Sequence, residues 1–363
     1  MDLVDLDGLS SRLNVIKTFS DMSDPEDIDA LVRQLRPRLR NVIGATIGKG
    51  GEGKTTVTTN LAYVLAEAEK EKGRQGKPTK PILYIELDSN GNGRLNLGIR
   101  GSEFDDDGLG FFEALTEDKG LKVVQGVRPY LDMVVSGCHN ADIPSSVTKL
   151  SDKYGITSYL LLAALLAQIS HRYRWILLDF SPGDKMIQRM GLAACTHLIA
   201  PMKGSDNAVI EGLGTLATLV RQIRRLNHEV AIVSLVFLGY RRVNDQPTSQ
   251  LTNLREKIGI LLDRAHISRE VLVSAFIRDG ATTANLARNY GMPAGEFALA
   301  AAGQLLESDT GKPVDRPRDE NGRYADPKRA LDLAGDYISV ATQVIQLVRQ
   351  RNQELHGDEA SHC

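Results

Sequence analysis

Nine residues decide the fold of this chain: Gly48-Lys49-Gly50-Gly51-Glu52-Gly53-Lys54-Thr55-Thr56. They fit the pattern G-x-x-x-x-G-K-[ST]. They stand between an apolar run, Val42 to Ile47, and a stretch with helical periodicity, Lys54 to Glu71. Glycines allow the backbone to curl so that successive N–H groups point at phosphate oxygens. A glycine-rich turn without function is the alternative, but the strand and helix on either side favour a phosphate-binding loop.

The end of this loop carries side chains that suit a nucleotide. Lys54 supplies a cation for β- and γ-phosphates, and the hydroxyl of Thr55 is the expected Mg²⁺ ligand. The loop also leads into a helix N-terminus, where free N–H groups and the helix dipole favour anions. We therefore expect ATP and Mg²⁺ as cofactors, with all nine residues from Gly48 to Thr56 binding the nucleotide.

Further apolar segments alternate with helical patterns along the chain. The clearest helix is Asp206 to Leu226, which has one apolar stripe. Strands that alternate with helices predict an α/β fold, a doubly wound and mainly parallel sheet with helices on both faces. The expected strands after the first are Pro81–Leu87, Leu131–Ser136, Trp175–Phe180, His197–Met202, Val230–Leu238 and Leu272–Phe276.

We expect three parts along the chain. Residues 1–39 form a helical extension, and residues 40–303 form the nucleotide-binding domain. Residues 304–363 form a loop and a C-terminal helix, roughly 327–352, that packs on this domain and ends in a frayed tail.

Composition narrows the class of protein. The chain has 363 residues, of which 42% are hydrophobic and 25% charged, as in an ordinary globular protein. A net charge of −2 excludes a globally basic nucleic-acid binder, though not a local basic patch. The three cysteines are scattered, which predicts neither a disulfide framework nor a zinc site and favours the cytoplasm. The most apolar stretch, Tyr159 to Ile169, is half a membrane span, so we expect a buried helix and no membrane insertion.

The run from Lys49 to Thr56 resembles the deviant Walker A motif, KGGxGKT[ST], of the ParA/MinD family of ATPases. The resemblance implies that Lys49 reaches the phosphates of the neighbouring subunit's nucleotide, in a sandwich homodimer that holds two ATP molecules. A cation supplied across an interface would stabilise the charge on the transferred phosphoryl group. The alternative is a solvated surface lysine.

Two aspartates are carried over from the same family. Glu86-Leu87-Asp88-Ser89-Asn90 matches its D-x-D-P-Q switch, which implies that Asp88 orients the attacking water; Glu86 replaces the first aspartate, and Ser89-Asn90 replaces Pro-Gln. Trp175 to Asp179 has the Walker B form, which implies that Asp179 holds Mg²⁺ through water. Either aspartate could instead only cap a turn. The catalytic residues that the resemblance implies are Lys49, Lys54 and Asp88.

Within this family, several branches remain open. A C-terminal helix without a strong basic face argues against a MinD-like membrane-associated regulator. Cys138 and Cys195 lie outside any C-x-x-C pair, which argues against an ATP-gated metal-cluster carrier; each is expected to be a small buried residue. A nucleotide-dependent biosynthetic ligase is a third alternative.

Basic residues favour the ParA-type branch, whose ATP dimer binds DNA non-specifically and segregates or positions a cargo. Arginines on surface turns suit phosphate contacts, although the helix dipole also favours them near helix C-termini. The resemblance implies slow hydrolysis, stimulated by a ParB-like or other cargo-adaptor protein, and association with the nucleoid. The candidate DNA contacts are Arg221, Arg224, Arg225, Arg241, Arg242, Arg278 and Arg288.

Overall fold

The computed structural model describes residues 25–47, 53–117, 119–181, 183–203, 206–239, 242–243, 246–247, 249–264, 275–307 and 310–356. Its centre is an eight-stranded sheet with the order β10-β7-β6-β1-β5-β2-β4-β3. Every neighbouring pair is parallel except β3 and β4. The strands are β1 (Val42–Ala45), β2 (Ile82–Glu86), β3 (Val124–Arg128), β4 (Leu131–Val134), β5 (Trp175–Asp179), β6 (His197–Met202), β7 (Ala231–Leu238) and β10 (Ala275–Ile277).

The predicted fold class, a doubly wound and mainly parallel sheet, is confirmed. Six of the seven expected strands begin within one residue of their predicted starts; for Leu272–Phe276, β10 covers the described part, and residues 271–274 lie outside the described residues. β3 was not expected, because it has no continuous apolar run: it lies at the sheet edge with only its first residue, Val124, buried.

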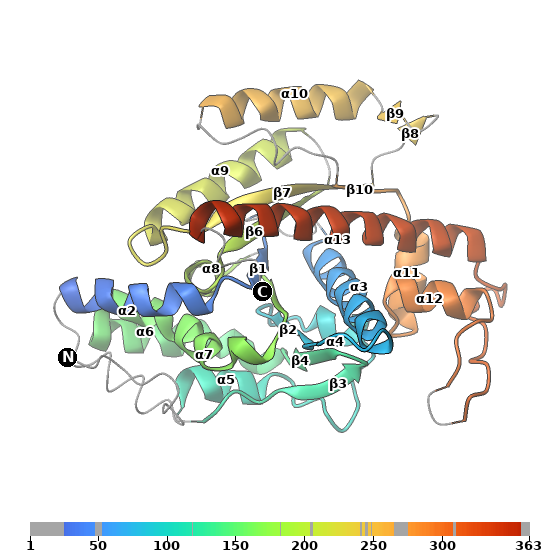
Figure 1. Ribbon diagram of the computed structural model, residues 1–363, viewed down its shortest axis with the longest axis horizontal. Coiled ribbons are helices and arrows are strands. Elements are labelled where there is room, and N and C mark those ends of the chain that lie inside the picture. Colours follow the sequence, from blue (N-terminus) through green and yellow to red (C-terminus); the bar gives the residue numbers. More distant parts are fainter. Residues whose placement is uncertain are drawn as a thin grey trace.

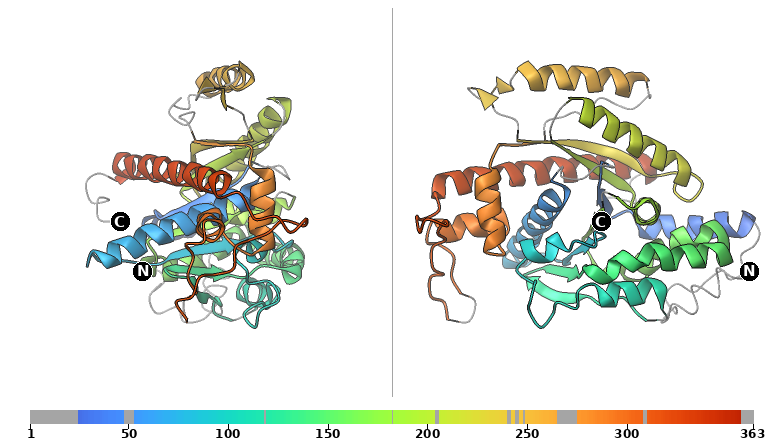
Figure 2. Two further views of the ribbon diagram at one scale, coloured as in Figure 1. Left: turned by 90° about the vertical axis from the view of Figure 1, so that its right-hand side faces the viewer. Right: turned by 180° about the vertical axis from the view of Figure 1, so that it is seen from behind.

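Helices cover both faces of the sheet (Figures 1 and 2). One layer contains α2 (Pro25–Arg38), α5 (Leu109–Thr116), α6 (Ile143–Tyr154), α7 (Leu161–Ile169), α8 (Lys185–Ala194) and α9 (Asp206–Ile223). The other contains α3 (Lys54–Arg74), α4 (Asn92–Asn96), α11 (Ala281–Asn289), α12 (Ala294–Ala301) and α13 (Pro327–His356). Beyond β7 lie α10 (Ser249–Arg264) and a small hairpin of β8 (Arg242–Val243) and β9 (Gln246–Pro247), at the top of Figure 1.

Alternation along the strands decides which side chains meet the phosphate-loop helix, α3. In β2, Leu83 and Ile85 join the core under α2 and α7, whereas Ile82 and Tyr84 join the core under α3. The next residue on the α3 face of β2 is Glu86. Asp179 lies on the same face, beside Glu86 in register, because β2 and β5 pair in parallel.

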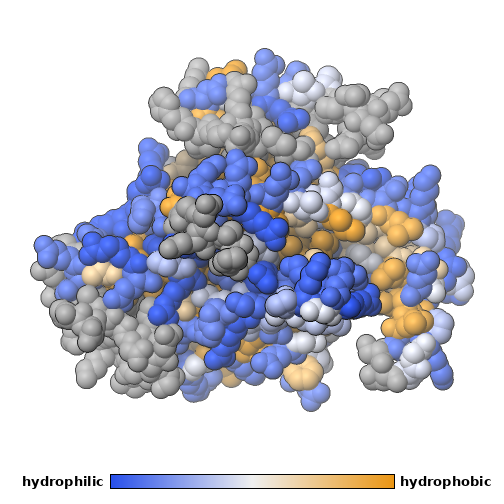
Figure 3. Space-filling model, in the orientation of Figure 1, coloured by the Kyte–Doolittle hydropathy of each residue, from blue (hydrophilic) through white to orange (hydrophobic). Residues whose placement is uncertain are grey.

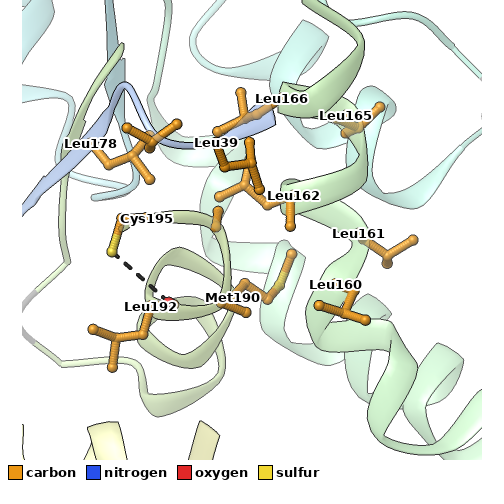
Figure 4. Close-up of a cluster of buried hydrophobic side chains, with 14 of the residues drawn as sticks. Leu39, Leu160, Leu161, Leu162, Leu165, Leu166, Leu178, Met190, Leu192 and Cys195 are labelled. Atoms are coloured by element: carbon orange, nitrogen blue, oxygen red, sulfur yellow. Dashed lines mark hydrogen bonds between the residues drawn. The ribbon is translucent and has the colours of Figure 1, made fainter. Parts of the chain in front are cut away.

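The first described helix, α2, belongs to the main core. Its Leu31 and Leu35 are almost fully buried, and α2 packs against α7. The residue that follows, Leu39, lies among Leu162, Leu166 and other apolar side chains (Figure 4). The stretch Tyr159 to Ile169, expected as a buried helix, contains α7, whose residues from 161 to 167 are all buried. α2 therefore helps to close one layer of the sandwich.

The C-terminal helix, α13, lies across the other layer, against α3, β7 and β10 (Figure 1). It continues to His356, a turn beyond the expected end at residue 352. Near its end, Asn352 forms a 3.0 Å hydrogen bond with Nε2 of the fully buried His197 and donates its amide to the carbonyl of Arg40 at 3.2 Å. No helix among the described residues is long and apolar enough to span a membrane.

The two described cysteines differ in environment. Cys195 is buried in the core shown in Figure 4, as expected. The expectation that Cys138 is buried was wrong, since it is exposed and its thiol donates to Asp107 at 2.7 Å. The reason is its position: it is the first residue of the short 3-10 helix Cys138–Asp142, which follows β4 at the end of the sheet.

Candidate active site

The phosphate-loop helix begins at the predicted residue. Gly53 has a left-handed φ of 78° and directly precedes α3. A side chain at this position would be strained, and its Cβ would lie 3.0 Å from a methyl group of Leu238. Glycine at 53 therefore allows the chain to turn sharply from the loop into the helix. Gly48, Lys49, Gly50, Gly51 and Glu52 lie outside the described residues.

The first turn of α3 places the expected nucleotide residues together. Lys54 is 5% exposed although it carries a charge, and Thr55 follows it on the side of Asp179. The carbonyl of Thr56 accepts from the amide of Asn60 at 2.7 Å. Lys54 and Thr55 thus stand at the N-terminus of a 21-residue helix, where the dipole favours an anion.

Asp179 lies at the carboxyl end of β5, between Ala45 of β1 and Glu86 of β2. It is fully buried, and burial raises its pKa to about 7. The hydroxyls of Thr55 and Tyr84 and the ammonium group of Lys54 act in the opposite direction. Tyr84 donates its hydroxyl to Oδ2 at 3.0 Å.

The other oxygen of Asp179, Oδ1, has no hydrogen-bond partner within the described part of the chain. A buried carboxylate with one oxygen unengaged, in a side chain that the hydroxyl of Thr55 also approaches, fits a hydrated Mg²⁺ ion that Asp179 would hold through water. Thr55 and Asp179 are thus brought together as the predicted metal site, and Mg²⁺ remains the expected ion.

Glu86 forms a second buried carboxyl group beside Asp179. Its Oε2 accepts from the N–H of Gly93 at 2.9 Å, while Oε1 has no hydrogen-bond partner among the described residues. Burial raises the pKa of Glu86 well above its ordinary value, and the charge of Asp179 raises it further. Gly93 allows this contact, because a Cβ there would lie 2.2 Å from the hydroxyl of Tyr84. Glu86 therefore ties the end of β2 to α4.

Asp88 lies between Glu86 and Gly93, in the turn from β2 to α4. Its side chain is 8% exposed, and Oδ1 accepts from the backbone N–H and the side-chain amide of Asn90 at 3.1 and 3.0 Å. The hydroxyl of Ser136 donates a hydrogen bond to the backbone carbonyl of Asp88. In this arrangement Asp88 caps its own turn, and its role with the attacking water stays a prediction.

The structure separates the candidate DNA contacts into two groups. Arg221, Arg224 and Arg225 are exposed at the end of α9 and in the turn before β7, so they lie at the amino edge of the parallel sheet. Arg225 is 3.8 Å from Asp29 of α2.

The second group lies at the carboxyl edge. Arg278 follows β10 and pairs with Asp332 and Asp336 of α13 at 3.0 and 2.8 Å, whereas Arg288 is exposed on α11. Arg242 belongs to β8, and Arg241 lies outside the described residues.

Sequence reasoning missed two residues of this site, Tyr84 and Gly93. The signal for Tyr84 was available: it lies two residues before Glu86, so it faces the same side of β2. Gly93 carried no such signal, because only the packing of α4 on Tyr84 shows that a side chain there would collide.

The fold and this site together define a P-loop nucleoside triphosphatase. Residues 40–232, more than half of the chain, match the family model described as an AAA domain, and the chain belongs to that family. It is an ATPase of the ParA/MinD type. One relative is the chromosome partitioning protein ParA of Caulobacter vibrioides, 26% identical over 284 residues, which are 76% of this chain and 95% of that protein.

Solved structures share the fold. A variant of McdA from Cyanothece in complex with ATP aligns with a TM-score of 0.56 and 15% identity, over 70% of this chain and 89% of that one. The septum site-determining protein MinD of Pyrococcus horikoshii, complexed with Mg-ADP, aligns with a TM-score of 0.52 and 16% identity, over 86% and 98%. Similar folds thus hold ATP, or ADP with Mg²⁺.

Proposed function

We propose that this chain is a ParA-type ATPase whose ATP-bound homodimer binds DNA without sequence preference and segregates or positions a cargo. The observation that carries the proposal is the meeting of Lys54, Thr55, Asp88 and Asp179 at the carboxyl edge of the sheet. Lys49, in the loop before them, completes the motif that distinguishes dimer-forming relatives.

Each described residue has one task at this edge. Lys54 binds the β- and γ-phosphates, and Thr55 and Asp179 would hold Mg²⁺. The metal, when bound, neutralises charge on the phosphate oxygens. Tyr84 keeps Asp179 oriented through the 3.0 Å hydrogen bond. Asp88 would exchange its contact with Asn90 for the attacking water, so slow turnover follows from a switch that must first rearrange.

Dimerisation treats the two arginine groups differently. In a face-to-face dimer with nucleotide in the interface, the two carboxyl edges come together and the amino edges face outwards. Arg288 and the β8–β9 hairpin with Arg242 lie on the side that dimerisation would join, so two weak basic patches there would act as one. Arg278 already pairs with two carboxylates of α13, so it contributes less positive charge.

The test measures binding of a non-specific duplex without nucleotide, with ADP and with ATP, across a salt series, while light scattering counts the subunits. We expect dimers and DNA binding with ATP only, with affinity that falls steeply with salt. A dimer that forms with ATP but ignores DNA at low salt would contradict the DNA part alone. It would leave the membrane-associated regulator and the metal-cluster carrier as the functions to test, by liposome co-sedimentation and by metal analysis of anaerobically purified protein.

Charge reversals then identify the DNA surface. Arg288→Glu should weaken ATP-dependent DNA binding more than Arg224→Glu, because only Arg288 lies on the joined edge. If Arg224→Glu has the larger effect, DNA is bound at the outer, amino edges of the dimer.

The partner is tested separately. A ParB-like or other cargo-adaptor protein should increase phosphate release by the ATP dimer, and it should do so less for Asp88→Ala. Fluorescent fusions should lie over the nucleoid if the ATP dimer binds DNA in the cell.

A further inference from the structure

A basic cavity lies at the opposite end of the sheet from the nucleotide residues. It has a volume of about 450 Å³ and is bordered by the end of α2, the turn before β1, Lys80 shortly before β2, and the chain from the end of α7 to β5. The cavity therefore lies beside the amino ends of β1, β2 and β5. These strands are four or five residues long, which separates the cavity from Asp179 and Glu86 by about 15 Å.

Positive charge dominates the lining of this cavity, which we call the amino-edge pocket. Four permanent cations line it, together with His171, and none of the described lining residues carries a carboxylate. The four cations are Arg38, Arg40, Lys80 and Arg174.

Within the described residues, Glu69 of α3 lies 3.5 Å from Arg174 of the lining. Glu69 also pairs with Lys72 and accepts from the backbone N–H of Lys80 at 3.1 Å. Glu69 is thus shared among several donors, and Arg40, Lys80 and Arg174 together carry more positive charge than this one carboxylate offsets.

The pocket contains a donor that the protein does not use. Nε of Arg40 is buried and has no hydrogen-bond partner within the described residues. A buried donor without an acceptor costs about 1–3 kcal/mol. Because this Nε is itself buried, an anion in the pocket would meet it only after the Arg40 side chain turns towards the cavity. The wall beside it is rigid, because the amide of Asn41 donates to the carbonyls of Ser170 and Tyr173 at 3.1 and 3.0 Å.

Helix dipoles explain only part of this arrangement. The C-terminus of α2 favours a cation such as Arg38 in its last turn. Lys80 and Arg174 belong to no helix. Lys80 lies two residues before β2, and Arg174 lies one residue before β5. Their convergence on the same cavity therefore needs another reason, and an anionic ligand provides one.

We propose that the amino-edge pocket binds the phosphate groups of a small phosphorylated molecule, at a site separate from the nucleotide loop. Arginine suits phosphate because its guanidinium donates two parallel hydrogen bonds, and Lys80 adds a mobile charge at the rim. The volume lies in the range of small-molecule sites.

The test is calorimetric titration of inorganic tripolyphosphate into the full chain saturated with ADP and Mg²⁺, so that the nucleotide loop is already filled. We expect one site per chain. Lys80→Glu and Arg40→Gln should each weaken binding about tenfold, the loss of one phosphate contact. Lys77→Glu is the matched control, because it makes the same charge change three residues away at an exposed position outside the pocket; it should change the affinity less than about twofold.

Three outcomes would overturn the proposal: no binding to the wild-type chain, an equal loss in the Lys77→Glu control, or binding that Lys80→Glu and Arg40→Gln leave unchanged. Should Arg40→Gln fail to fold, the comparison between Lys80→Glu and Lys77→Glu still decides, since both side chains are exposed.

Duplex binding by the same variants tests the DNA backbone as the other source of phosphate. If Lys80→Glu weakens DNA binding and tripolyphosphate does not bind, the pocket serves the DNA backbone and the small-ligand proposal is wrong. Failure of this proposal leaves the ATPase site untouched, because the titration uses the ADP-bound chain.

Discussion

The two ends of β2 and β5 carry opposite kinds of ionisable side chain, carboxyl groups at one end and cations at the other. At the carboxyl edge, Glu86 and Asp179 are fully buried side by side, with Asp88 close to them. At the amino edge, Lys80 and Arg174 precede the same two strands and line a basic cavity. The carboxyl edge therefore needs Lys54 and Mg²⁺ before it can accept a triphosphate, whereas the amino edge is ready for an anion. Carboxyl groups thus gather at one end of these strands and cations at the other, and a substitution at one edge can be tested without changing the other.

The largest effect is expected at Lys54. Lys54→Ala should lower ATP hydrolysis by about 100- to 1,000-fold, because a buried cation at the carboxyl edge no longer offsets the charge of the phosphates. Phosphate release and nucleotide binding, measured together, check this prediction. Lys70→Ala on the same helix is the control: its ammonium group pairs with Glu67 of the same helix, away from the nucleotide residues, and the activity of this variant should match that of the wild type. Normal hydrolysis by Lys54→Ala would refute the site.

Asp179→Asn should have opposite effects on stability and on activity. In the folded chain the pKa of Asp179 rises from its ordinary value of 3.8 to about 7 because of burial. The folded state therefore holds this proton more tightly than the unfolded state. The stability from this group is full below pH 4 and is lost as pH rises through 7.

The variant should be more stable than wild type at pH 8, by about 1–3 kcal/mol in the nucleotide-free protein, and nearly inactive. Denaturant unfolding from pH 4 to 8 measures the first effect, and Mg²⁺-dependent phosphate release measures the second. If the free energy of unfolding depends on pH in the same way in both proteins, burial does not raise the pKa of Asp179.

A smaller effect is expected at Glu86, which differs from the aspartate of the family motif. Glu86→Ala removes the acceptor of the Gly93 N–H and should cost about 1–3 kcal/mol. It should also lower kcat by loosening the turn that holds Asp88. Glu86→Gln keeps an acceptor for the Gly93 N–H and should retain most of the stability and most of kcat. Unfolding curves and kcat at saturating ATP distinguish the two variants, and identical losses would exclude an anchoring role.

The smallest effect is expected at the amino edge, where Asn352 joins α13 to His197 and Arg40. Asn352→Ala should destabilise the protein by about 1–2 kcal/mol and leave kcat within about twofold, because no residue of the carboxyl edge moves. Thermal unfolding and phosphate release test both statements. A large loss of activity would show that the two edges are linked through α13.

Local patterns in the sequence predicted much of the fold. Each buried strand reads as a short apolar run, and the loop from Gly48 to Thr56 has a pattern that backbone geometry explains. β3 was missed because this edge strand, Val124–Arg128, has no such run. Cys138 was misjudged, because burial depends on which elements cover a loop, and residue type alone does not show this.

The sequence by itself determined the class of protein, its cofactor loop and the aspartate at the end of β5, because each depends on residues adjacent in the chain. Only the tertiary structure decided that Tyr84, Glu86 and Asp179 share one buried cluster, and that the arginines lie at two edges. Only the tertiary structure brought Arg40, Lys80 and Arg174 into one cavity. The physical reason is that strand pairing and helix packing bring together residues that are far apart in the chain, and no local pattern records which of them will meet.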